Sequence, residues 1–188
     1  MPGRLVLLLA LLLSPMLAAA AGRARAPAPQ PRLYWTGPDH GSVPAAIAGG
    51  TVIHTAALAS LLRNGGVLLV DVAKATRRPS GLPAGTIWMP PPHFDIPGSI
   101  WIPGAGEGAM PANLDAFFRA RLKSLTGGDR NRKIVVYCHP QCWLSWNAAK
   151  RAISYGYRHV YWYPDGMEGW RKAGHPTAVA RPEGPRAG

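Results

Sequence analysis

The sequence predicts an α/β fold in which helices cover both faces of a parallel sheet. Short apolar runs rich in Val, Leu and Ile alternate with segments of helical periodicity through most of the chain. The apolar runs are continuous, as in strands that are buried on both faces of a sheet. Because strands and helices alternate, successive strands are expected to be parallel and joined by helical crossovers.

The first regular segment is TVIHTAALASLLRNGG at residues 51–66, which starts as a short strand and continues as a helix. Thr55 is the expected N-cap of this helix, and a Gly-Gly pair ends it. The next segment, VLLVDV at residues 67–72, is a buried strand that closes on Asp71.

Residues 73–98 are rich in proline and are expected to be irregular. Beyond them the pattern becomes regular again, and the length and spacing of the apolar runs distinguish strands from helices. In chain order the expected elements are a strand at 99–103, a helix at 113–125, a strand at 133–138, a helix at 143–155, a strand at 159–164 and a helix at 167–174.

The first 21 residues have the three parts of a secretory signal peptide. Arg4 supplies a positive n-region, Leu5 to Leu13 form an apolar run, and Ala18 to Ala21 offer cleavage sites. The apolar run is too short to span a bilayer, and an uncleaved anchor is the alternative interpretation. We therefore expect an exported, periplasmic protein that meets the membrane only through this segment during export.

About 165 residues remain after the expected cleavage, which fits one domain, placed at residues 51–178. Residues 22–50 are rich in Pro, Ala and Gly and are expected to form a linker or extended arm of weak order, in which Tyr34 and Trp35 are candidates to dock onto the domain. Residues 179–188 are expected to be a disordered tail. The formal net charge is +12, but the basic residues are scattered and form no recognition motif, so no nucleic-acid partner is expected.

Both cysteines of the chain lie in the stretch IVVYCHPQCWLSW, residues 134–146. Cys138 comes at the carboxyl end of a predicted strand, just before a predicted helix. Ligands bind at this edge of parallel sheets, and the helix N-terminus offers free N–H groups and partial positive charge. Such a position lowers the pKa of a thiol and favours the reactive thiolate, and His139 is a candidate for further positive charge beside the sulfur.

Four interpretations of the cysteine pair remain open. As a structural staple, a disulfide between Cys138 and Cys142 closes a short loop and contributes only about 2 kcal/mol. As a redox couple, Cys138 attacks, and Cys142 resolves a mixed disulfide, a sulfenic acid or a persulfide. As a metal site, the two thiolates suit Cu(I) or zinc, with His139, His159 and His175 as the nearest further candidates. The fourth interpretation is a partner-binding module without catalysis.

Several segments of the sequence resemble the rhodanese-like domain family, in family order over residues 51–178. They are LLVDV around Asp71, IPGSIWIP at 96–103, VVYC ending at Cys138, and GYRHVYWYPDGMEGWRKAGHP at 156–176. The resemblance implies a five-stranded parallel sheet flanked by helices, and sulfurtransferase or thiol–disulfide exchange activity. It also implies that Cys138 stands at the position of the persulfide-forming cysteine and that Asp71 is mainly structural.

The cysteine segment departs from the family pattern, in which arginines bind anionic sulfur donors. Here it reads CHPQCW, so that His139 and Trp143 stand at the two arginine positions. Ala73 stands where a further arginine usually follows the strand aspartate. An anionic donor such as thiosulfate therefore loses its bidentate guanidinium partners.

The C-x3-C-W sequence followed by Ser-Trp-Asn resembles a narrower family, the CXXCW-motif proteins associated with catabolism that depends on pyrroloquinoline quinone (PQQ). This resemblance implies an accessory role in periplasmic alcohol oxidation, with a quinoprotein dehydrogenase or its electron-transfer proteins as partner. The alternative is a non-catalytic partner-binding or copper-binding accessory module. We expect no cofactor and no resident metal ion. The candidate site residues are the catalytic pair Cys138 and Cys142, the loop residues His139, Pro140, Gln141 and Trp143, and, in supporting roles, Asp71, Ser145 and His175.

Overall fold

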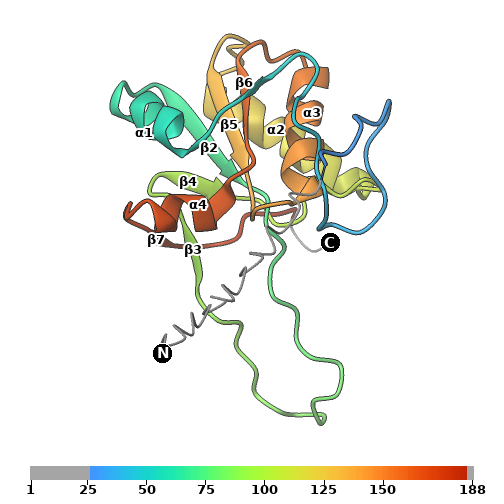
Figure 1. Ribbon diagram of the computed structural model, residues 1–188. Coiled ribbons are helices and arrows are strands. Elements are labelled where there is room, and N and C mark those ends of the chain that lie inside the picture. Colours follow the sequence, from blue (N-terminus) through green and yellow to red (C-terminus); the bar gives the residue numbers. More distant parts are fainter. Residues whose placement is uncertain (1–25, 186–188) are drawn as a thin grey trace, which may run out of the picture.

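The central sheet consists of five parallel strands: β1 (Thr51–Val52), β2 (Val67–Asp71), β4 (Ser99–Trp101), β5 (Lys133–Tyr137) and β6 (Val160–Tyr163). Their order across the sheet is β1-β6-β5-β2-β4. In this computed structural model, which describes residues 26–185, β5 lies in the middle of the sheet (Figure 1). The predicted five-stranded parallel sheet is confirmed.

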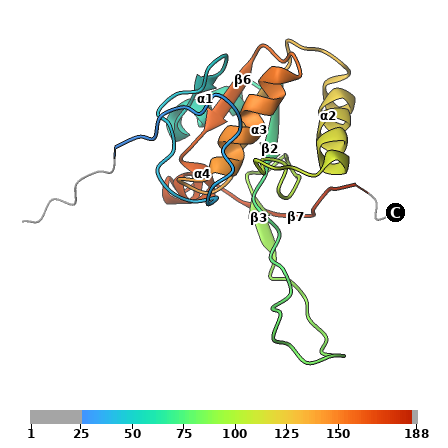
Figure 2. The ribbon, with the colours of Figure 1, turned by 90° about the vertical axis from the view of Figure 1, so that its right-hand side faces the viewer.

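Helices cover both faces of this sheet, as predicted (Figures 1 and 2). Side chains of α1 and α4 form one core with the sheet, and those of α2 and α3 form the other. Successive side chains of a strand point to opposite faces, so Tyr137 of β5 belongs to the first core and Val136 to the second. The helices are α1 (Thr55–Arg63), α2 (Ala112–Thr126), α3 (Trp143–Ser154) and α4 (Gly166–Lys172).

The start of α1 is held by a side chain from a distant loop. The sequence predicts Thr55 as the N-cap, but Thr55 is the first helical residue, and His54 stands at the cap position without a side-chain hydrogen bond to the helix. Asp165, which precedes α4, accepts hydrogen bonds from the N–H and the hydroxyl of Thr55, both at 3.0 Å. A carboxylate is favourable at a helix N-terminus. Asp165 therefore joins the start of α1 to the start of α4.

Two short strands, β3 (His93–Asp95) and β7 (Ala178–Ala180), pair in an antiparallel sheet of their own. The sequence predicts irregular backbone and a disordered tail for these two segments. The structure differs because β7 pairs with β3, and because Glu183 accepts two hydrogen bonds from Arg121 at 2.6 and 2.8 Å. β3 has three residues within a proline-rich stretch, and its alternation is too short to be recognised there.

Between β2 and β3 the chain leaves the domain as a long arm, residues 75–91 (Figures 1 and 2). Two large apolar side chains on this arm, Ile87 and Met89, are 93% and 81% exposed. Side chains as exposed as these contribute nothing to either core, so the arm is not needed to hold the fold.

Residues 26–50 lie against the domain, although the sequence predicts a linker of weak order over residues 22–50. Ile47 is buried in the core that α2 and α3 form with the sheet. The N–H of Ala28 donates to the carbonyl of Val43 at 3.1 Å, so the segment folds back on itself. We name residues 26–50 the strap.

The signal peptide predicted at residues 1–21 lies outside the described residues. From residue 26 to residue 185, none of the helices combines the length and the hydrophobicity that crossing a membrane would require.

Candidate active site

The two cysteines lie in one short segment between β5 and α3, which we name the cysteine loop (residues 138–142). Cys138 directly follows β5, and Cys142 occupies the N-cap position of α3. The two residues are joined by a disulfide, with their Cα atoms 6.2 Å apart. Their exposed fractions are only 2% and 1%. The pair is thus located at the carboxyl end of the central strand, where parallel sheets bind ligands.

The back of the cysteine loop rests on the start of α4. Gly166 has a φ of 62°, and a Cβ atom added to it would lie 2.6 Å from the carbonyl oxygen of Cys138. The next residue, Met167, donates its N–H to the same oxygen at 2.9 Å. Only glycine combines this backbone conformation with so close an approach.

The outer part of the cysteine loop is formed by Pro140 and Gln141, which are both exposed. Gln141 has a φ of 55° and is the one non-glycine residue with positive φ between residues 26 and 185. Its carbonyl accepts the N–H of Gly41 from the strap at 3.0 Å. Residues held in such sparsely populated conformations concentrate at functional sites.

His139 is paired with an acidic side chain of α4. Its Nδ1 atom lies 2.8 Å from Oε1 of Glu168, and both side chains are about half exposed. When His139 is protonated, Glu168 offsets its charge. The imidazole therefore adds less positive charge beside the sulfur than the sequence suggests.

The strap covers the cysteine loop and the start of α3. The ring of Trp35 stacks on that of Trp143, with centroids 4.5 Å apart. The N–H of Trp143 donates to the carbonyl of Asp39 at 2.7 Å, and His40 pairs with Cys142 in an isolated antiparallel bridge. The N–H of Trp143, which a free helix N-terminus would offer to an anion, is therefore already bound by the strap.

The strap is tied down near the cysteines by a lysine that follows β2. Nζ of Lys74 lies 2.6 Å from Oδ2 of Asp39 and 3.3 Å from Oε1 of Glu107. The hydrogen bond to Asp39 raises the pKa of the Lys74 ammonium group. This pair is partly exposed, so we expect it to position the strap more than to stabilise the fold.

The Ser-Trp-Asn sequence after the cysteines also serves the strap. Asn147 accepts the N–H of Trp35 and donates to its carbonyl, both at 2.9 Å. Nε1 of Trp146 donates to the carbonyl of Ala46 at 3.1 Å. Asn147, which the sequence analysis did not single out, could have been recognised from its place in this sequence. Trp143 of the C-x3-C-W sequence, together with Trp146 and Asn147, therefore binds the strap to α3.

Ser145 lies directly behind the cysteine loop. Its hydroxyl donates to the carbonyl of Cys142 at 3.0 Å and accepts Nε1–H of Trp162 at 3.0 Å. The hydroxyl is buried and links the backbone of Cys142 to the side chain of Trp162 in β6, so Ser145 supports the position of Cys142.

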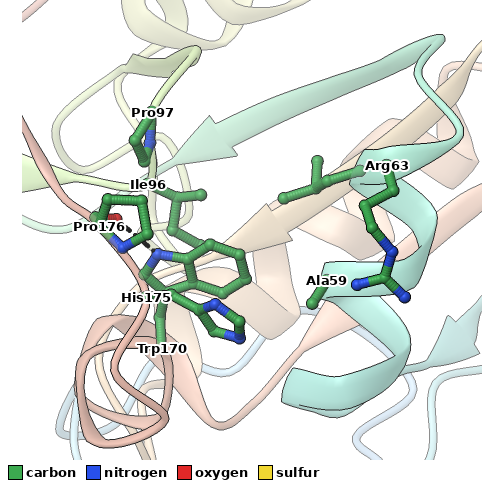
Figure 3. A pocket seen from close by; sticks show the side chains of 8 residues that line it. Ala59, Arg63, Ile96, Pro97, Trp170, His175 and Pro176 are labelled. Carbon is green, nitrogen blue, oxygen red and sulfur yellow. Dashed lines mark hydrogen bonds between the residues drawn. The ribbon is translucent and has the colours of Figure 1, made fainter.

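His175 lies in a cavity apart from the cysteine loop, whereas Asp71 pairs with Tyr137, the residue before Cys138, and only its side chain points away. His175 stacks on Trp170, with centroids 4.1 Å apart, in the wall of a cavity of about 440 Å³ (Figure 3). This cavity lies between α1 and α4, lined by Ala59 and Trp170, on the face of the sheet opposite to the core that contains Cys138. The residues on either side of Asp71 in the chain pack in the same core as Cys138. The side chain of Asp71 therefore points to the opposite face of the sheet.

Comparison with known proteins identifies the domain. A family model described as "rhodanese-like domain" matches residues 54–173. No curated protein matches the sequence. Among solved structures, YnjE is 16% identical, with a TM-score of 0.50 over 73% of this chain and 33% of that one. Thiosulfate sulfurtransferase from Pseudomonas aeruginosa is 18% identical, with a TM-score of 0.48 over 73% of this chain and 22% of that one.

A human single-domain sulfurtransferase is 23% identical, with a TM-score of 0.40 over 64% of this chain and 95% of that one. At 16% identity, the likeness to YnjE bears on the fold alone. The family model extends from the start of α1 to the end of α4, includes the cysteine loop and covers more than half of the chain. The chain belongs to the rhodanese-like domain family.

Proposed function

We propose that this protein exchanges electrons or sulfur through the Cys138–Cys142 pair, as a thiol–disulfide or persulfide exchange protein. The observation that carries this proposal is the disulfide between the family's nucleophile position and a second cysteine at the start of α3. It closes one short loop and joins no distant elements, so its contribution to stability is only about 2 kcal/mol. A pair at a helix N-terminus suits reversible chemistry better than it suits holding the fold.

In thiol–disulfide exchange, the Cys138 thiolate attacks one sulfur of a substrate disulfide and expels the other sulfur as a thiolate. Cys142 then attacks the Cys138 sulfur and expels the second substrate thiolate. The substrate has gained two electrons and the protein disulfide has formed. The reverse sequence oxidises a substrate dithiol by the same two electrons.

In persulfide exchange, Cys138 takes a sulfane sulfur from a donor and holds it as a persulfide. The Cys142 thiolate attacks the Cys138 sulfur, hydrosulfide leaves, and the Cys138–Cys142 disulfide forms. The sulfane sulfur has then been reduced to sulfide by the two electrons of the thiol pair. Both branches end in the same disulfide, so both need an external dithiol as reductant before the next turnover.

Neutral donors fit this site better than anionic ones. The loop has no guanidinium at either family position, Glu168 stands beside His139, and the strap binds the N–H of Trp143. An anionic donor such as thiosulfate would meet a carboxylate in place of bidentate partners. We therefore propose a protein thiol, a disulfide or a neutral polysulfide as the reaction partner.

The strap must move before either sulfur can react, because both cysteines are almost fully buried beneath it. Around the cysteines its contacts are single hydrogen bonds and one stacked ring, while Ile47 anchors its far end in the core. The part of the strap from Trp35 to Gly41 can therefore open while Ile47 stays in place, at a lower free-energy cost than opening a core. We propose that strap opening controls access to the pair.

We also propose export and a role with a partner protein. The signal-peptide pattern supports export to the periplasm, where a disulfide is the resting form of many thiol pairs. The C-x3-C-W and Ser-Trp-Asn residues support membership of the CXXCW-motif proteins associated with PQQ-dependent catabolism. On that ground we propose a periplasmic quinoprotein dehydrogenase, or one of its electron-transfer proteins, as the partner.

A second function, partner binding without catalysis, is favoured by the arm at residues 75–91. Ile87 and Met89 are almost fully exposed, and exposed apolar side chains on a projecting segment suit protein contact. Replacing both with serine should abolish binding of the partner while Cys138→Ser leaves that binding intact. If Cys138→Ser also abolishes the function in the cell, binding without catalysis is rejected.

The test of the proposed function uses two matched serine variants of the full chain. In Cys142→Ser the intermediate on Cys138 has no resolving thiol, so a mixed disulfide or persulfide should accumulate and appear in the intact mass. Cys138→Ser removes the attacking thiol and should accumulate neither adduct. Equal adducts on both variants would refute the assigned roles. Copper analysis of the reduced protein tests the copper-binding alternative, which is rejected if no Cu(I) is bound.

A further inference from the structure

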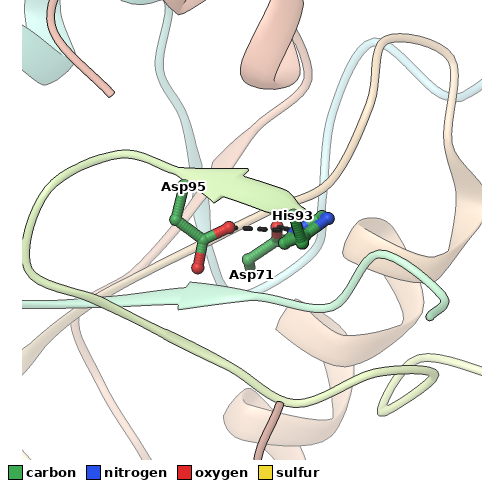
Figure 4. Close-up of side chains that lie close together, drawn as sticks. All are labelled: Asp71, His93 and Asp95. Carbon is green, nitrogen blue, oxygen red and sulfur yellow. Dashed lines mark hydrogen bonds and ion pairs between the residues drawn. The ribbon is translucent and has the colours of Figure 1, made fainter. Parts of the chain in front are cut away.

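A second group of buried polar side chains lies on the other face of the sheet (Figure 4). Asp71 ends β2, and His93 and Asp95 stand two residues apart on β3, so their side chains point the same way. Nε2 of His93 lies 2.7 Å from Oδ2 of Asp71 and 3.0 Å from Oδ1 of Asp95. One donor atom from each residue lies within 4.8 Å of the other two. An imidazole and two carboxylates therefore converge on one point.

Asp95 has no hydrogen-bond partner in this group. Its side chain is only 4% exposed, and neither of its oxygens accepts a hydrogen bond. The single nitrogen that faces both carboxylates gives its hydrogen bond to Asp71. A buried carboxylate that accepts no hydrogen bond costs on the order of 1–3 kcal/mol. Asp95 shares the single nitrogen of His93 with Asp71 and has no hydrogen bond of its own, which points to a cation that can bind both carboxylates at once.

The charges of the group agree with this conclusion. The side chains of Asp71, His93 and Asp95 are only 2%, 17% and 4% exposed. One imidazolium can balance the charge of only one of the two carboxylates, whereas a divalent cation balances both.

We propose that Asp71, His93 and Asp95 form a binding site for a divalent transition-metal ion, with one imidazole nitrogen and two carboxylate oxygens as ligands. Zinc binds this donor set at about 2.0–2.2 Å, so Nε2 of His93 needs to move away from the two carboxylate oxygens by roughly half an ångström. Cu(I) prefers sulfur, and Mg²⁺ and Ca²⁺ prefer sites made only of oxygen. Three protein ligands leave a coordination position for water or for a small ligand.

The surroundings hold two of these ligands in place. Oδ1 of Asp71 accepts the N–H of Ala73 at 2.7 Å, which leaves Oδ2 turned toward His93. The imidazole stacks on the ring of Trp101, with centroids 3.8 Å apart. Such outer contacts orient metal ligands. His93 and Trp101 also line a cavity of about 250 Å³ at the base of the arm, through which an ion can reach the site.

This site is independent of the cysteine pair. Val70 and Val72 pack in the core that contains Cys138, and Asp71 between them points to the opposite face. An ion bound at Asp71 would fasten β3, and with it the base of the arm, to the end of β2. The proposal can therefore fail while the proposed function of the cysteines stands, and the reverse also holds.

The test is a titration of the full chain with Zn²⁺ while the cysteines are held as the disulfide, so that no thiolate competes for the metal. The unaltered protein should bind one equivalent, and Asp95→Asn and His93→Gln should each weaken binding at least tenfold. His54→Gln is the matched control, because His54 also lies 2.7 Å from one aspartate but faces no second carboxylate. It should bind zinc as the unaltered protein does.

Substitution with Co²⁺ gives a readout that needs no variant. Cobalt in the unaltered, oxidised protein should give ligand-field absorption and no sulfur-to-metal charge transfer. The proposal is overturned if no saturable equivalent binds, if charge transfer from sulfur appears, or if folded Asp95→Asn and His93→Gln variants bind zinc as well as His54→Gln does. Circular dichroism tests whether the variants fold. If they do not fold, the cobalt spectrum of the unaltered protein decides whether the proposal stands.

Discussion

The indole of Trp35 lies face to face with that of Trp143, with centroids 4.5 Å apart and planes inclined by 14°. In the family pattern that the sequence resembles, an arginine for the sulfur donor stands at the position of Trp143. We infer that this one residue both leaves anionic donors without that partner and gives the strap a surface to stack on.

Trp35→Ala should open the strap and expose the disulfide. Loss of the stacked ring should lower the free energy of unfolding by about 2 kcal/mol, because both apolar burial and aromatic contact are lost. The rate at which dithiothreitol reduces the disulfide should rise severalfold, as followed by alkylation and mass spectrometry. Leu33→Ala is the control, because Leu33 lies on the same strap with 78% exposure. Equal reduction rates in the two variants would contradict control of access by the strap.

Gly166→Ala should disturb the cysteine loop more than an ordinary glycine substitution does. The new methyl group would meet the carbonyl oxygen of Cys138 in addition to the cost of a positive φ. We expect a loss of about 2–3 kcal/mol in urea unfolding. Gly174→Ala is the matched control, because Gly174 has a φ of 77° with open space around it. It should cost only about 1 kcal/mol. Similar losses in both variants would show that the close approach does not matter.

Thiosulfate should be a poor sulfur donor, and a guanidinium group added to the cysteine loop should raise the rate of sulfur transfer from it. His139→Arg places a bidentate anion partner at a family position, on a side chain that is about half exposed and free to adjust. Sulfur transfer from thiosulfate to cyanide should rise at least tenfold in this variant. His139→Lys carries the same charge without the planar fork and should gain less. If the lysine variant gains as much as the arginine variant, charge alone limits the donor.

The sequence predicts the central sheet, its helices and the position of Cys138, because buried strands and amphipathic helices have periods that are readable over five or more residues. It also predicts that Trp35 can dock onto the domain, but it does not predict that the whole of the strap is ordered against it. Trp35, Asp39 and Ala46 are held by a stacked ring and single hydrogen bonds to distant residues, and such contacts leave no periodicity.

The group around His93 escapes the sequence for a similar reason. His93 and Asp95 alternate along a strand of three residues within a proline-rich stretch, and their partner Asp71 lies in another strand. The spacing of His93 and Asp95 indicates a shared face only once the strand is known. His175 shows the converse. Its family motif suggested a place near the active site, but it stacks on Trp170 in a separate cavity.

The central claim is that Cys138 and Cys142 open and close as a two-electron couple. The most direct test is a titration of the full chain in redox buffers of dithiothreitol, with the thiols alkylated and counted by mass spectrometry. We predict a single transition in which both thiols appear together, at a potential above about −300 mV, the range below which structural disulfides usually lie. A disulfide that stays closed well below that potential would contradict the claim and leave the pair as a structural staple.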